Sequence, residues 1–456
     1  MRFIALLPEA MQMYSEKIRD LLEREGIDTG DTVEFEKGKI KITGKLMPNT
    51  EANGEDILVI KLANGYNVGV SFSGSRLKLV KKGESNFDFP KAATAQDPRL
   101  PKVSLIYTGG TIGSKIDYKT GGVYMLLKPE ELLYEIPELS KIARISVTKL
   151  FSMSSEDMSY KEWQAIAERV ASEINSGARG VVVTIGTDTM HYASAALSFM
   201  LQDLNAPVVL TGSQRSSDRG SSDAFMNIIC AATIAATSDI AEVGICMHDS
   251  SSDSRCSFIR GTKARKMHTS RRDAFRAIND KPIAYVDANG NISYNNDYKR
   301  VIPDQRKAVS AVTGYSGKVA IVKAYPDADP SILKFYEGKD YDGIIIEGTG
   351  LGHVPVAPSS REMSWLPWIK SAVDKGVIVG ITSQCIYGRV NRSVYRNLRL
   401  ISSAGAVYCE DMTAETAYVK LSWLLKNYGK EKAREMLPNN LRGEITSRTK
   451  FETFMV

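Results

Sequence analysis

From Val103 onward, the chain alternates short, continuously apolar runs with longer segments of helical spacing, such as Trp163–Ile174 and Ala193–Leu201. Strands buried on both faces read as continuous apolar runs, and their alternation with helices is typical of parallel sheets. The pattern predicts the α/β class, with doubly wound, mainly parallel sheets. The polar tract around Asn289–Arg306 interrupts it, so we expect two lobes. The later apolar runs lie at Val181–Ile185, Val208–Leu210, Val243–Met247, Val319–Val322, Ile344–Ile346 and Val377–Ile381.

The residues before Val103 follow other periods. Residues 9–25 have the apolar spacing of one helix face, and Gly26 ends that pattern. Beyond Gly30, apolar residues such as Val33 and Phe35 alternate with polar ones, which predicts a small all-β, barrel-like domain. We expect a helix plus β-barrel domain at 1–82, a linker at 83–101, a large lobe with the active site at 102–300, and a smaller lobe with a tail at 301–456.

Composition limits the class and location of the protein. With 456 residues the chain is too long for one core, and its net charge of +6 permits an acidic partner without demanding one. The five cysteines are widely spaced and form no CxxC pair. We therefore expect no disulfide framework and no metal site, and a reducing cytoplasm fits this usage. No segment approaches the ~20 apolar residues that cross a bilayer, so we expect no membrane association.

The first apolar run ends in a pair of glycines. The stretch Val103–Lys115 reads VSLIYTGGTIGSK, which predicts a buried strand followed by a tight turn at Gly109-Gly110. In an open parallel sheet, ligands bind beyond the carboxyl ends of the strands. Glycines there let a substrate approach backbone N–H groups. Thr111 would place a nucleophilic hydroxyl at this turn, although a turn that only packs tightly is the alternative.

A second strand end carries the same kind of residues. The stretch Val181–Met190 reads VVVTIGTDTM, and a helix is expected over His191–Leu201. Thr187 and Asp188 would then lie at the amino end of that helix, where its dipole favours negative charge. Both residues are preferred helix caps, so simple capping is the alternative to a catalytic role.

The two strand ends together, TGGTI followed by GTDTM, resemble the two signatures of bacterial-type L-asparaginases and related glutaminases. The resemblance extends from about Lys102 to about Leu425, and it implies an asparaginase-like fold that hydrolyses a carboxamide. Further stretches that match the family's motifs are Tyr124 in GGVYMLL, Ser155-Glu156-Asp157-Met158, Thr211-Gly212-Ser213-Gln214, Ser222-Asp223…Asn227 and Arg260-Gly261-Thr262-Lys263.

The resemblance implies catalytic roles for four residues. Thr111 would be the attacking nucleophile and one of two essential hydroxyls. The second hydroxyl would be that of Thr187, hydrogen-bonded with Asp188 and Lys263. Lys263 accepts a proton only when it is neutral, so burial or its surroundings must lower its pKa. Without the motif, Lys263 would be read as a solvated charge, because it opens a basic run over residues 263–276.

The resemblance also implies substrate-binding residues. Tyr124 falls where the family has a mobile-loop tyrosine beside the nucleophile. Ser155 and Glu156 fall in the turn that holds the substrate's α-carboxylate and α-amino groups. A packed tyrosine and a turn serine are the ordinary alternatives. Glu156 stands where asparaginases more often have Gln, a difference that would alter hydrogen bonding to the α-amino group.

Two features go beyond a minimal asparaginase: the N-terminal helix-plus-β unit and the tail Glu431–Val456. Together with several long strings they resemble the D subunits of archaeal glutamyl-tRNA(Gln) amidotransferases. This resemblance implies that glutamine is hydrolysed and that ammonia passes to a partner, the E subunit of the amidotransferase. The partner would use ATP and Mg²⁺ to convert Glu-tRNA(Gln) to Gln-tRNA(Gln), with no cofactor in this chain. The strings are RKMHTSRRDAFRAIN (265–279), GTGLGHVP (348–355), TSQCIYGRVNRSVY (382–395) and EDMTAETAYVKL (410–421).

The same resemblance implies the assembly and leaves alternatives open. A homodimer core within a heterotetramer is expected, with tRNA(Gln) bound mainly through the partner. The basic run 263–276 would either touch tRNA phosphates or be solvated and ion-paired. A free-standing L-asparaginase with an added N-terminal domain is the main alternative function. A catalytically dead scaffold or RNA-binding module is a further alternative, and the joint presence of the four catalytic-type residues argues against it.

Overall fold

The computed structural model describes residues 14–47, 54, 56–62, 67–83, 96–110, 114–116, 123–125, 136–215, 221–304 and 307–454. The chain divides into two units. The first comprises residues 1–93 together with 113–126, and the second comprises residues 94–112 together with 127–456.

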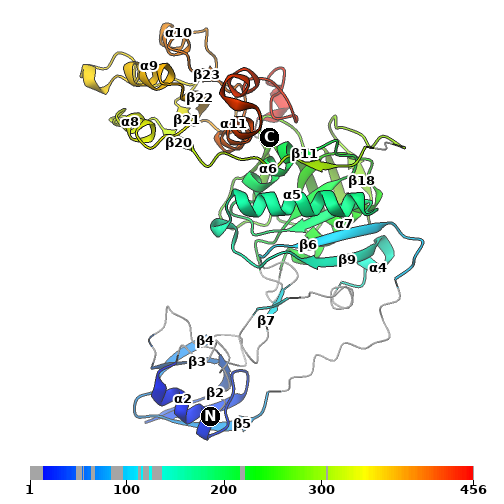
Figure 1. Ribbon diagram of the computed structural model, residues 1–456. Helices are drawn as coiled ribbons and strands as arrows, with labels where there is room; N and C mark the ends of the chain where they lie inside the picture. Colours follow the sequence, from blue (N-terminus) through cyan, green and yellow to red (C-terminus); the bar gives the residue numbers. More distant parts are fainter. Residues whose placement is uncertain are drawn as a thin grey trace, which may run out of the picture. The chain divides into compact units, whose positions relative to one another are not determined.

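The first unit combines one helix with a curved antiparallel sheet (Figure 1). Helix α2 (Glu16–Arg24) buries Ile18 and Leu22 against the sheet. Gly26 follows the helix with φ +62°, the left-handed conformation that glycine adopts readily at helix ends. All neighbouring strands are antiparallel in the order β4-β3-β2-β1-β5, so the predicted all-β unit is confirmed. The strands are β1 (Thr32–Lys37), β2 (Ile40–Met47), β3 (Ile57–Lys61), β4 (Asn67–Ser71) and β5 (Arg76–Lys81).

A short hairpin from later in the chain also groups with the first unit. Strand β7 (Ser114–Ile116) pairs antiparallel with β8 (Val123–Met125), and Tyr124 is opposite Lys115. The sequence places this segment in the large lobe, yet its two strands pair with each other instead of extending the large lobe's sheet. The side chain of Tyr124 lies outside the described residues.

The large lobe of the second unit is built on an eight-stranded sheet with the order β18-β17-β14-β13-β12-β10-β6-β9. Five neighbouring strands, β13, β12, β10, β6 and β9, are parallel to one another. Strands β14, β17 and β18 add antiparallel strands at the other edge. The strands are β6 (Lys102–Tyr107), β9 (Arg144–Lys149), β10 (Gly180–Thr184), β12 (Val208–Thr211), β13 (Val243–His248), β14 (Arg255–Arg260), β17 (Ala284–Asp287) and β18 (Ile292–Tyr294).

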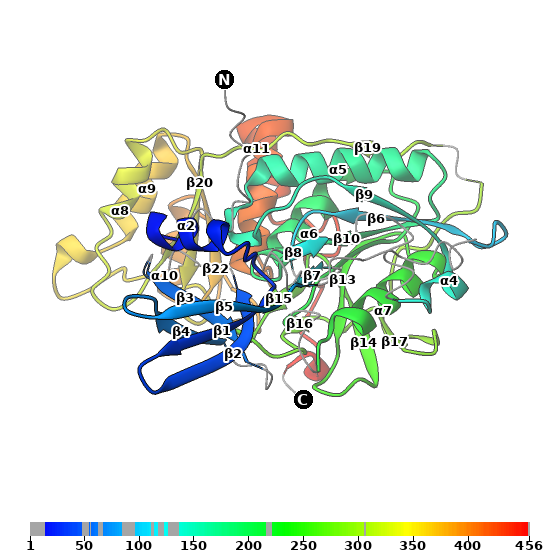
Figure 2. The same ribbon diagram turned by 90° about the horizontal axis from the view of Figure 1, so that it is seen from below.

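Helices cover both faces of this sheet, as Figure 2 shows with α5 on one side and α7 on the other. Every residue of β10 is buried, as its continuous apolar run predicts. Helix α5 begins with a capping box, in which Glu162 accepts a hydrogen bond from the backbone of Ser159. The doubly wound arrangement is therefore confirmed. The helices of this lobe are α4 (Leu139–Ile142), the 3₁₀ helix η1 (Ser155–Asp157), α5 (Tyr160–Asn175), α6 (Met190–Met200) and α7 (Ala224–Thr237).

Two small ribbons accompany the large sheet. Strand β11 (Leu201–Gln202) pairs with β19 (Ser310–Ala311), which joins the end of α6 to the segment that leads into the small lobe. Strand β15 (Ala264–Lys266) pairs with β16 (Phe275–Ala277) in a hairpin. This second hairpin carries part of the basic run that the sequence singles out.

The small lobe has a four-stranded parallel sheet, and its elements gather together in both views (Figures 1 and 2). Helix α11 packs on this sheet and also on α6, so one apolar core continues from the large lobe into the small one. Among the described residues, no helix combines the length and apolarity needed to span a membrane. The elements are β20 (Val319–Lys323), α8 (Ile332–Glu337), β21 (Gly343–Gly348), η2 (Arg361–Met363), α9 (Leu366–Asp374), β22 (Ile378–Ser383), α10 (Arg396–Ser403), β23 (Val407–Tyr408), α11 (Ala414–Met436) and η3 (Phe451–Thr453).

After α11, the C-terminal tail (residues 438–454) packs back on the molecule through a buried ion pair. Lys420 on α11 lies 2.6 Å from the Glu444 carboxylate, and both side chains are fully buried. Glu444 also accepts hydrogen bonds from the backbone N–H groups of Leu441 and Arg442, at 2.9 and 2.6 Å. The carboxylate is therefore balanced by one cation and two backbone donors.

Replacing Lys420 by Met tests this anchor. The variant leaves the Glu444 carboxylate buried without its cation, and we expect the free energy of unfolding to fall by about 3–5 kcal/mol. Urea unfolding of the full chain measures the change. Lys420→Met combined with Glu444→Gln should recover much of the loss, because a neutral amide oxygen still accepts the two backbone bonds. A single variant as stable as the wild type would show that the pair does not hold the tail.

Candidate active site

The glycine pair after β6 and the threonine-bearing turn after β10, both predicted from the sequence, lie side by side. Strands β6 and β10 are parallel neighbours, so their carboxyl ends meet at one edge of the sheet. A Cβ atom added to Gly110 would lie 3.0 Å from the backbone nitrogen of Gly186, so glycine permits this approach. Gly109 has φ +136°, and a Cβ atom there would lie 2.0 Å from the Met153 carbonyl oxygen. Thr111, the next residue, lies outside the described residues.

The centre of the site is a lysine amine that bridges two side chains. Lys266, at the end of β15, donates to the Thr187 hydroxyl at 2.9 Å and to the Asp188 carboxylate at 2.6 Å. The lysine side chain is 10% exposed, whereas that of Asp188 is 64% exposed. The amine is thus largely buried, and the carboxylate faces solvent. A hydroxyl, an amine and a carboxylate in this contact can exchange a proton.

The prediction that Lys263 joins Thr187 and Asp188 is wrong. Lys263 precedes β15, and its amine donates to the Asp411 carboxylate of the small lobe at 2.8 Å. Both side chains are 1% exposed. Burial lowers the pKa of Lys263, and the charge of Asp411 opposes that shift. The lysine that meets the two predicted residues is Lys266, three positions later in the same basic run.

The capping alternative for Thr187 and Asp188 also fails. Helix α6 has Thr189 as its N-cap residue, and no side-chain capping bond is formed there. Instead, the Ser155 hydroxyl accepts the backbone N–H groups of Asp188 and Thr189 at 3.2 and 3.4 Å. Ser155 is buried and thus fixes the amino end of α6, while Glu156 is exposed beside it on η1. The side chains of Thr187 and Asp188 are therefore available to accept hydrogen bonds from Lys266.

The loop after β12 packs against Thr187. A Cβ atom on Gly212 would lie 3.0 Å from the Thr187 methyl group, so the loop passes close to that residue. Asp223 accepts the backbone N–H of Gln214 at 3.0 Å, and Asn227 donates to the Gly212 carbonyl at 2.9 Å. The stretches 211–214 and 222–227 therefore form one structure, as two matched motifs of the same family would.

A buried histidine stands next to the charged group. His191, in the first turn of α6, is 9% exposed, and its buried Nδ1 has no hydrogen-bond partner among the described residues. Burial lowers the pKa of His191 to about 4, and the nearby Glu415 carboxylate opposes this effect. Glu415 itself lies 3.0 Å from Arg265, the neighbour of Lys266 on β15. The imidazole is therefore neutral at pH 7.

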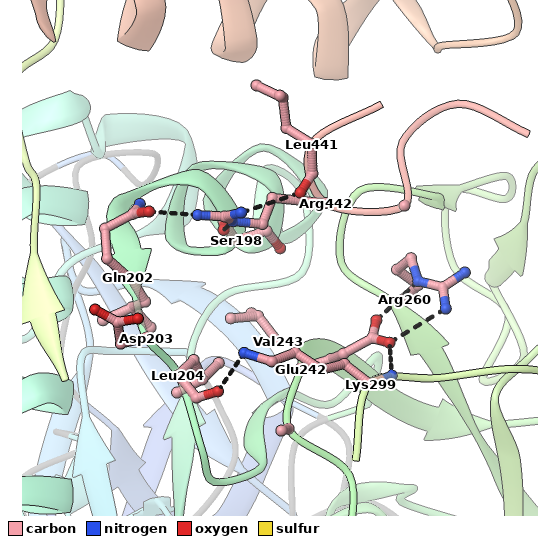
Figure 3. Close-up of a pocket in the computed structure, with 13 residues that line it drawn as sticks. Ser198, Gln202, Asp203, Leu204, Glu242, Val243, Arg260, Lys299, Leu441 and Arg442 are labelled. Atoms are coloured by element: carbon pink, nitrogen blue, oxygen red, sulfur yellow. Dashed lines mark hydrogen bonds and ion pairs between the residues drawn. The ribbon is translucent and has the colours of Figure 1, made fainter. Parts of the chain in front are cut away.

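A pocket of about 460 Å³ lies at the opposite, amino edge of the large sheet, and none of the predicted site residues lines it (Figure 3). Arg260 in this pocket is paired with Glu242 at 2.8 Å, and Lys299 donates to the Leu204 carbonyl at 2.7 Å. These bonds fasten the chain at the end of α6 and the start of β13. We assign this pocket to packing around the C-terminal tail, because Arg442 fills one side of it.

Comparison with known proteins places these features in one family. Three family models match in order: "GatD N-terminal domain" at residues 27–80, "Asparaginase, N-terminal" at 102–300 and "Glutaminase/Asparaginase C-terminal domain" at 318–437. The D subunit of glutamyl-tRNA(Gln) amidotransferase from Pyrococcus horikoshii is 46% identical over 447 residues, which cover 96% of this chain and 100% of that protein. The D subunit from Thermococcus kodakarensis is 47% identical, covering 96% and 99%. This chain belongs to the family of amidotransferase D subunits.

Solved structures agree with the asparaginase-like part of the fold. The thermostable L-asparaginase from Thermococcus kodakarensis has a TM-score of 0.66 and 28% identity, covering 76% of this chain and 99% of that one. L-asparaginase I from Vibrio cholerae has a TM-score of 0.65 and 29% identity, with the same coverage. The asparaginase-like fold of this member of the D-subunit family is therefore shown over the two lobes.

The pKa of His191 gives a test of this environment. Between about pH 6.5 and pH 4, His191 binds a proton in the unfolded chain but not in the folded chain. Protonation therefore lowers the free energy of unfolding as the pH drops. The difference in pKa corresponds to about 3 kcal/mol over that interval. In His191→Gln, we expect the free energy of unfolding to decline less steeply from pH 6.5 to pH 4. The same substitution at exposed His268 is the control, and parallel curves for His191→Gln and wild type would contradict the assignment.

Proposed function

We propose that this chain is the glutamine-hydrolysing subunit of a tRNA-dependent amidotransferase. One observation carries the proposal: the Lys266 amine is bonded to both Thr187 and Asp188 at the carboxyl end of β10. It occurs in a chain that aligns over nearly its whole length with amidotransferase D subunits. The site geometry supports amide hydrolysis, and the family supports glutamine as the amide and ammonia as the product passed on.

The proposed reaction uses one hydroxyl to attack and the lysine group to move protons. Thr111 attacks the carboxamide carbon of glutamine, its proton passes to the Thr187 oxygen, and the Thr187 hydroxyl proton passes to Lys266, which reacts in its neutral form. That proton returns to the nitrogen as the C–N bond breaks, and ammonia leaves. Water then cleaves the Thr111 ester and releases glutamate. Backbone N–H groups at the glycine turns are the proposed donors to the oxyanion.

Four residues are proposed to hold the rest of the substrate. Ser155 accepts two backbone bonds, and these leave its own hydroxyl proton for the substrate's α-carboxylate. The exposed carboxylates of Glu156 and Asp188 are suited to the α-ammonium group. Tyr124 is proposed as a substrate-binding residue because it matches the tyrosine motif of the asparaginase family. Recognition by charge at both α-groups would orient the side-chain amide toward the attacking Thr111.

The ammonia is proposed to pass to a partner, the E subunit of the amidotransferase, because ammonia in neutral water is mostly protonated and no longer nucleophilic. ATP and Mg²⁺, bound by the partner, would activate the γ-carboxyl group of Glu-tRNA(Gln) for attack by ammonia. Among the described residues of this chain, no group of His, Cys, Asp and Glu is placed to hold a metal ion. A homodimer core in a cytoplasmic heterotetramer is the proposed assembly.

Binding of tRNA(Gln) mainly through the partner is supported by the basic run 263–276, because its charges are paired within the chain. Arg272 lies 2.6 Å from Asp253, and Asp273 pairs with two further arginines. Paired surface charges release fewer counterions when they meet phosphates. The ion pairs of the run are Lys263–Asp411, Arg265–Glu415, Lys266–Asp188, Arg271–Asp273, Arg272–Asp253 and Arg276–Asp273.

Thr187→Ala tests the division of labour. In the complex with its partner, we expect glutamine-dependent amidation of tRNA to fall at least ~100-fold, because the proton route loses its hydroxyl. Amidation with ammonium chloride as the nitrogen source should stay at the wild-type level, since that reaction bypasses this site. Equal loss of both activities would contradict a glutaminase role. A chain that hydrolyses asparagine rapidly without partner or tRNA would favour a free-standing asparaginase instead.

Lys266→Arg tests the proton acceptor. The guanidinium keeps the charge and can pair with Asp188, but it does not give up its proton, so glutamine hydrolysis should fall at least ~100-fold. The matched control is Lys281→Arg, a partly exposed lysine whose partner is the exposed Glu452. Glutaminase assays of both variants with melting curves decide the point. Wild-type turnover in Lys266→Arg would remove that lysine from the proton route.

A further inference from the structure

The C-terminal tail reaches the two elements that form the site, although it lies beyond residue 437, where the last family model ends. Its first contact is with α6. Arg442 donates to the Ser198 carbonyl at 3.0 Å and to the side-chain oxygen of Gln202, directly after the helix (Figure 3). The tail thus holds the carboxyl end of the helix whose amino end follows Asp188.

The second contact is with the segment that leads into β15. The Thr262 hydroxyl donates to the Arg442 carbonyl at 3.1 Å. Gly443 follows with φ +76°, and a Cβ atom there would lie 2.5 Å from Arg260, so the tail turns closely against the end of β14. The same stretch of tail therefore touches α6 on one side and the start of the lysine hairpin on the other.

The third contact is a buried charge cluster. The Asp411 carboxylate accepts the Lys263 amine at 2.8 Å, the Thr446 backbone N–H at 3.0 Å and the Thr446 hydroxyl at 2.5 Å. Lys263 and Asp411 are both 1% exposed. The tail hydroxyl shares the carboxylate oxygen that binds Lys263, so Thr446 helps to fix the position of that lysine. Lys266 lies three residues further along the same hairpin.

We propose that the C-terminal tail is a positioning segment of the active site, which sets the distance between Lys266 and the pair Thr187–Asp188. Arg442 fixes the helix side of this contact, and Thr446 fixes the hairpin side through Asp411 and Lys263. The proposal rests on the proposed role of Lys266 in proton transfer. Lys263, which the sequence places in the catalytic group, acts here as a positioning residue.

The chemistry makes this contact sensitive to small displacements. A proton passes between groups in hydrogen-bond contact, and a shift of about 1 Å at a reacting group costs on the order of 100-fold in rate. Substrate binding by Ser155 and Glu156 does not use the hairpin, and the exposed Asp188 carboxylate is carried by the turn after β10, not by the hairpin. Loosening the tail should therefore lower kcat and leave KM nearly unchanged. A loss of folded protein lowers the apparent kcat in the same way, so kcat is calculated per folded chain from melting curves recorded under the assay conditions.

The test is Thr446→Val in the full chain with its partner, assayed for glutamine hydrolysis. Valine keeps the shape and the backbone N–H but removes the hydroxyl bond to Asp411. We expect kcat to fall about tenfold, with KM within about twofold of wild type. Thr446→Ser should restore kcat. Thr453→Val is the matched control, because Thr453 lies in the same tail and its hydroxyl bonds only to the Lys450 carbonyl among the described residues.

Several results would overturn the positioning role of the C-terminal tail. Wild-type kcat in Thr446→Val, or an equal fall in Thr453→Val, overturns the proposal. If Thr446→Val does not fold, Arg442→Met tests the helix side, with exposed Arg448→Met as its control; the same fall in kcat alone is expected, and unchanged kcat overturns the proposal. If Lys266→Arg is fully active, the proposed proton route has failed. If it is inactive while the tail variants turn over normally, only the positioning role has failed.

Discussion

The bridge from the Lys266 amine to Thr187 and Asp188 is the contact that the rest of this structure serves. A lysine amine that is largely withdrawn from water is held there because a hydroxyl and a carboxylate replace its lost hydration. The two sides of the bridge come from different elements, the turn after β10 and the β15 hairpin. Each side is fixed by its own contacts, the turn by the Ser155 hydroxyl and the hairpin by the bond from Lys263 to Asp411.

Ion pairs supply much of that fixing between the lobes. Lys263–Asp411, almost completely buried, and Arg265–Glu415, partly buried, join the hairpin to the small lobe, and the fully buried pair Lys420–Glu444 joins the tail to α11. Buried pairs add little net stability, because desolvation offsets most of their attraction, but they are strongly directional. An apolar interface of the same size would tolerate small displacements between α11 and the large lobe. An interface with hydrogen-bonded charges loses several bonds when the two sides shift. Such an interface suits a site whose function depends on exact geometry more than on net stability.

The sequence predicts the sheets and helices well because their signals are local. Continuous apolar runs such as Val181–Ile185 mark strands, and the helical spacing of Trp163–Ile174 marks α5. The choice between Lys263 and Lys266 is a different kind of question. It depends on Asp411, which is 148 positions from Lys263, and on which lysine the hairpin turns toward β10. Neighbouring residues in the run carry no information on either point, so spacing alone selects the wrong lysine.

The basic run illustrates the same limit for surfaces. Read as a string, six cations within residues 263–276 suggest a patch for phosphates, yet each cation has a carboxylate partner supplied by the fold. Asp188 and Asp253 lie earlier in the chain and Asp411 and Glu415 lie far beyond the run, whereas Asp273, shared by Arg271 and Arg276, lies within it. For four of the six cations, the charge that remains available to another molecule is therefore set by residues outside the run. A count of charges along the chain therefore measures only composition. The tertiary ion pairs distinguish the proposed catalytic Lys266, the buried Lys263 and the paired surface arginines within one segment.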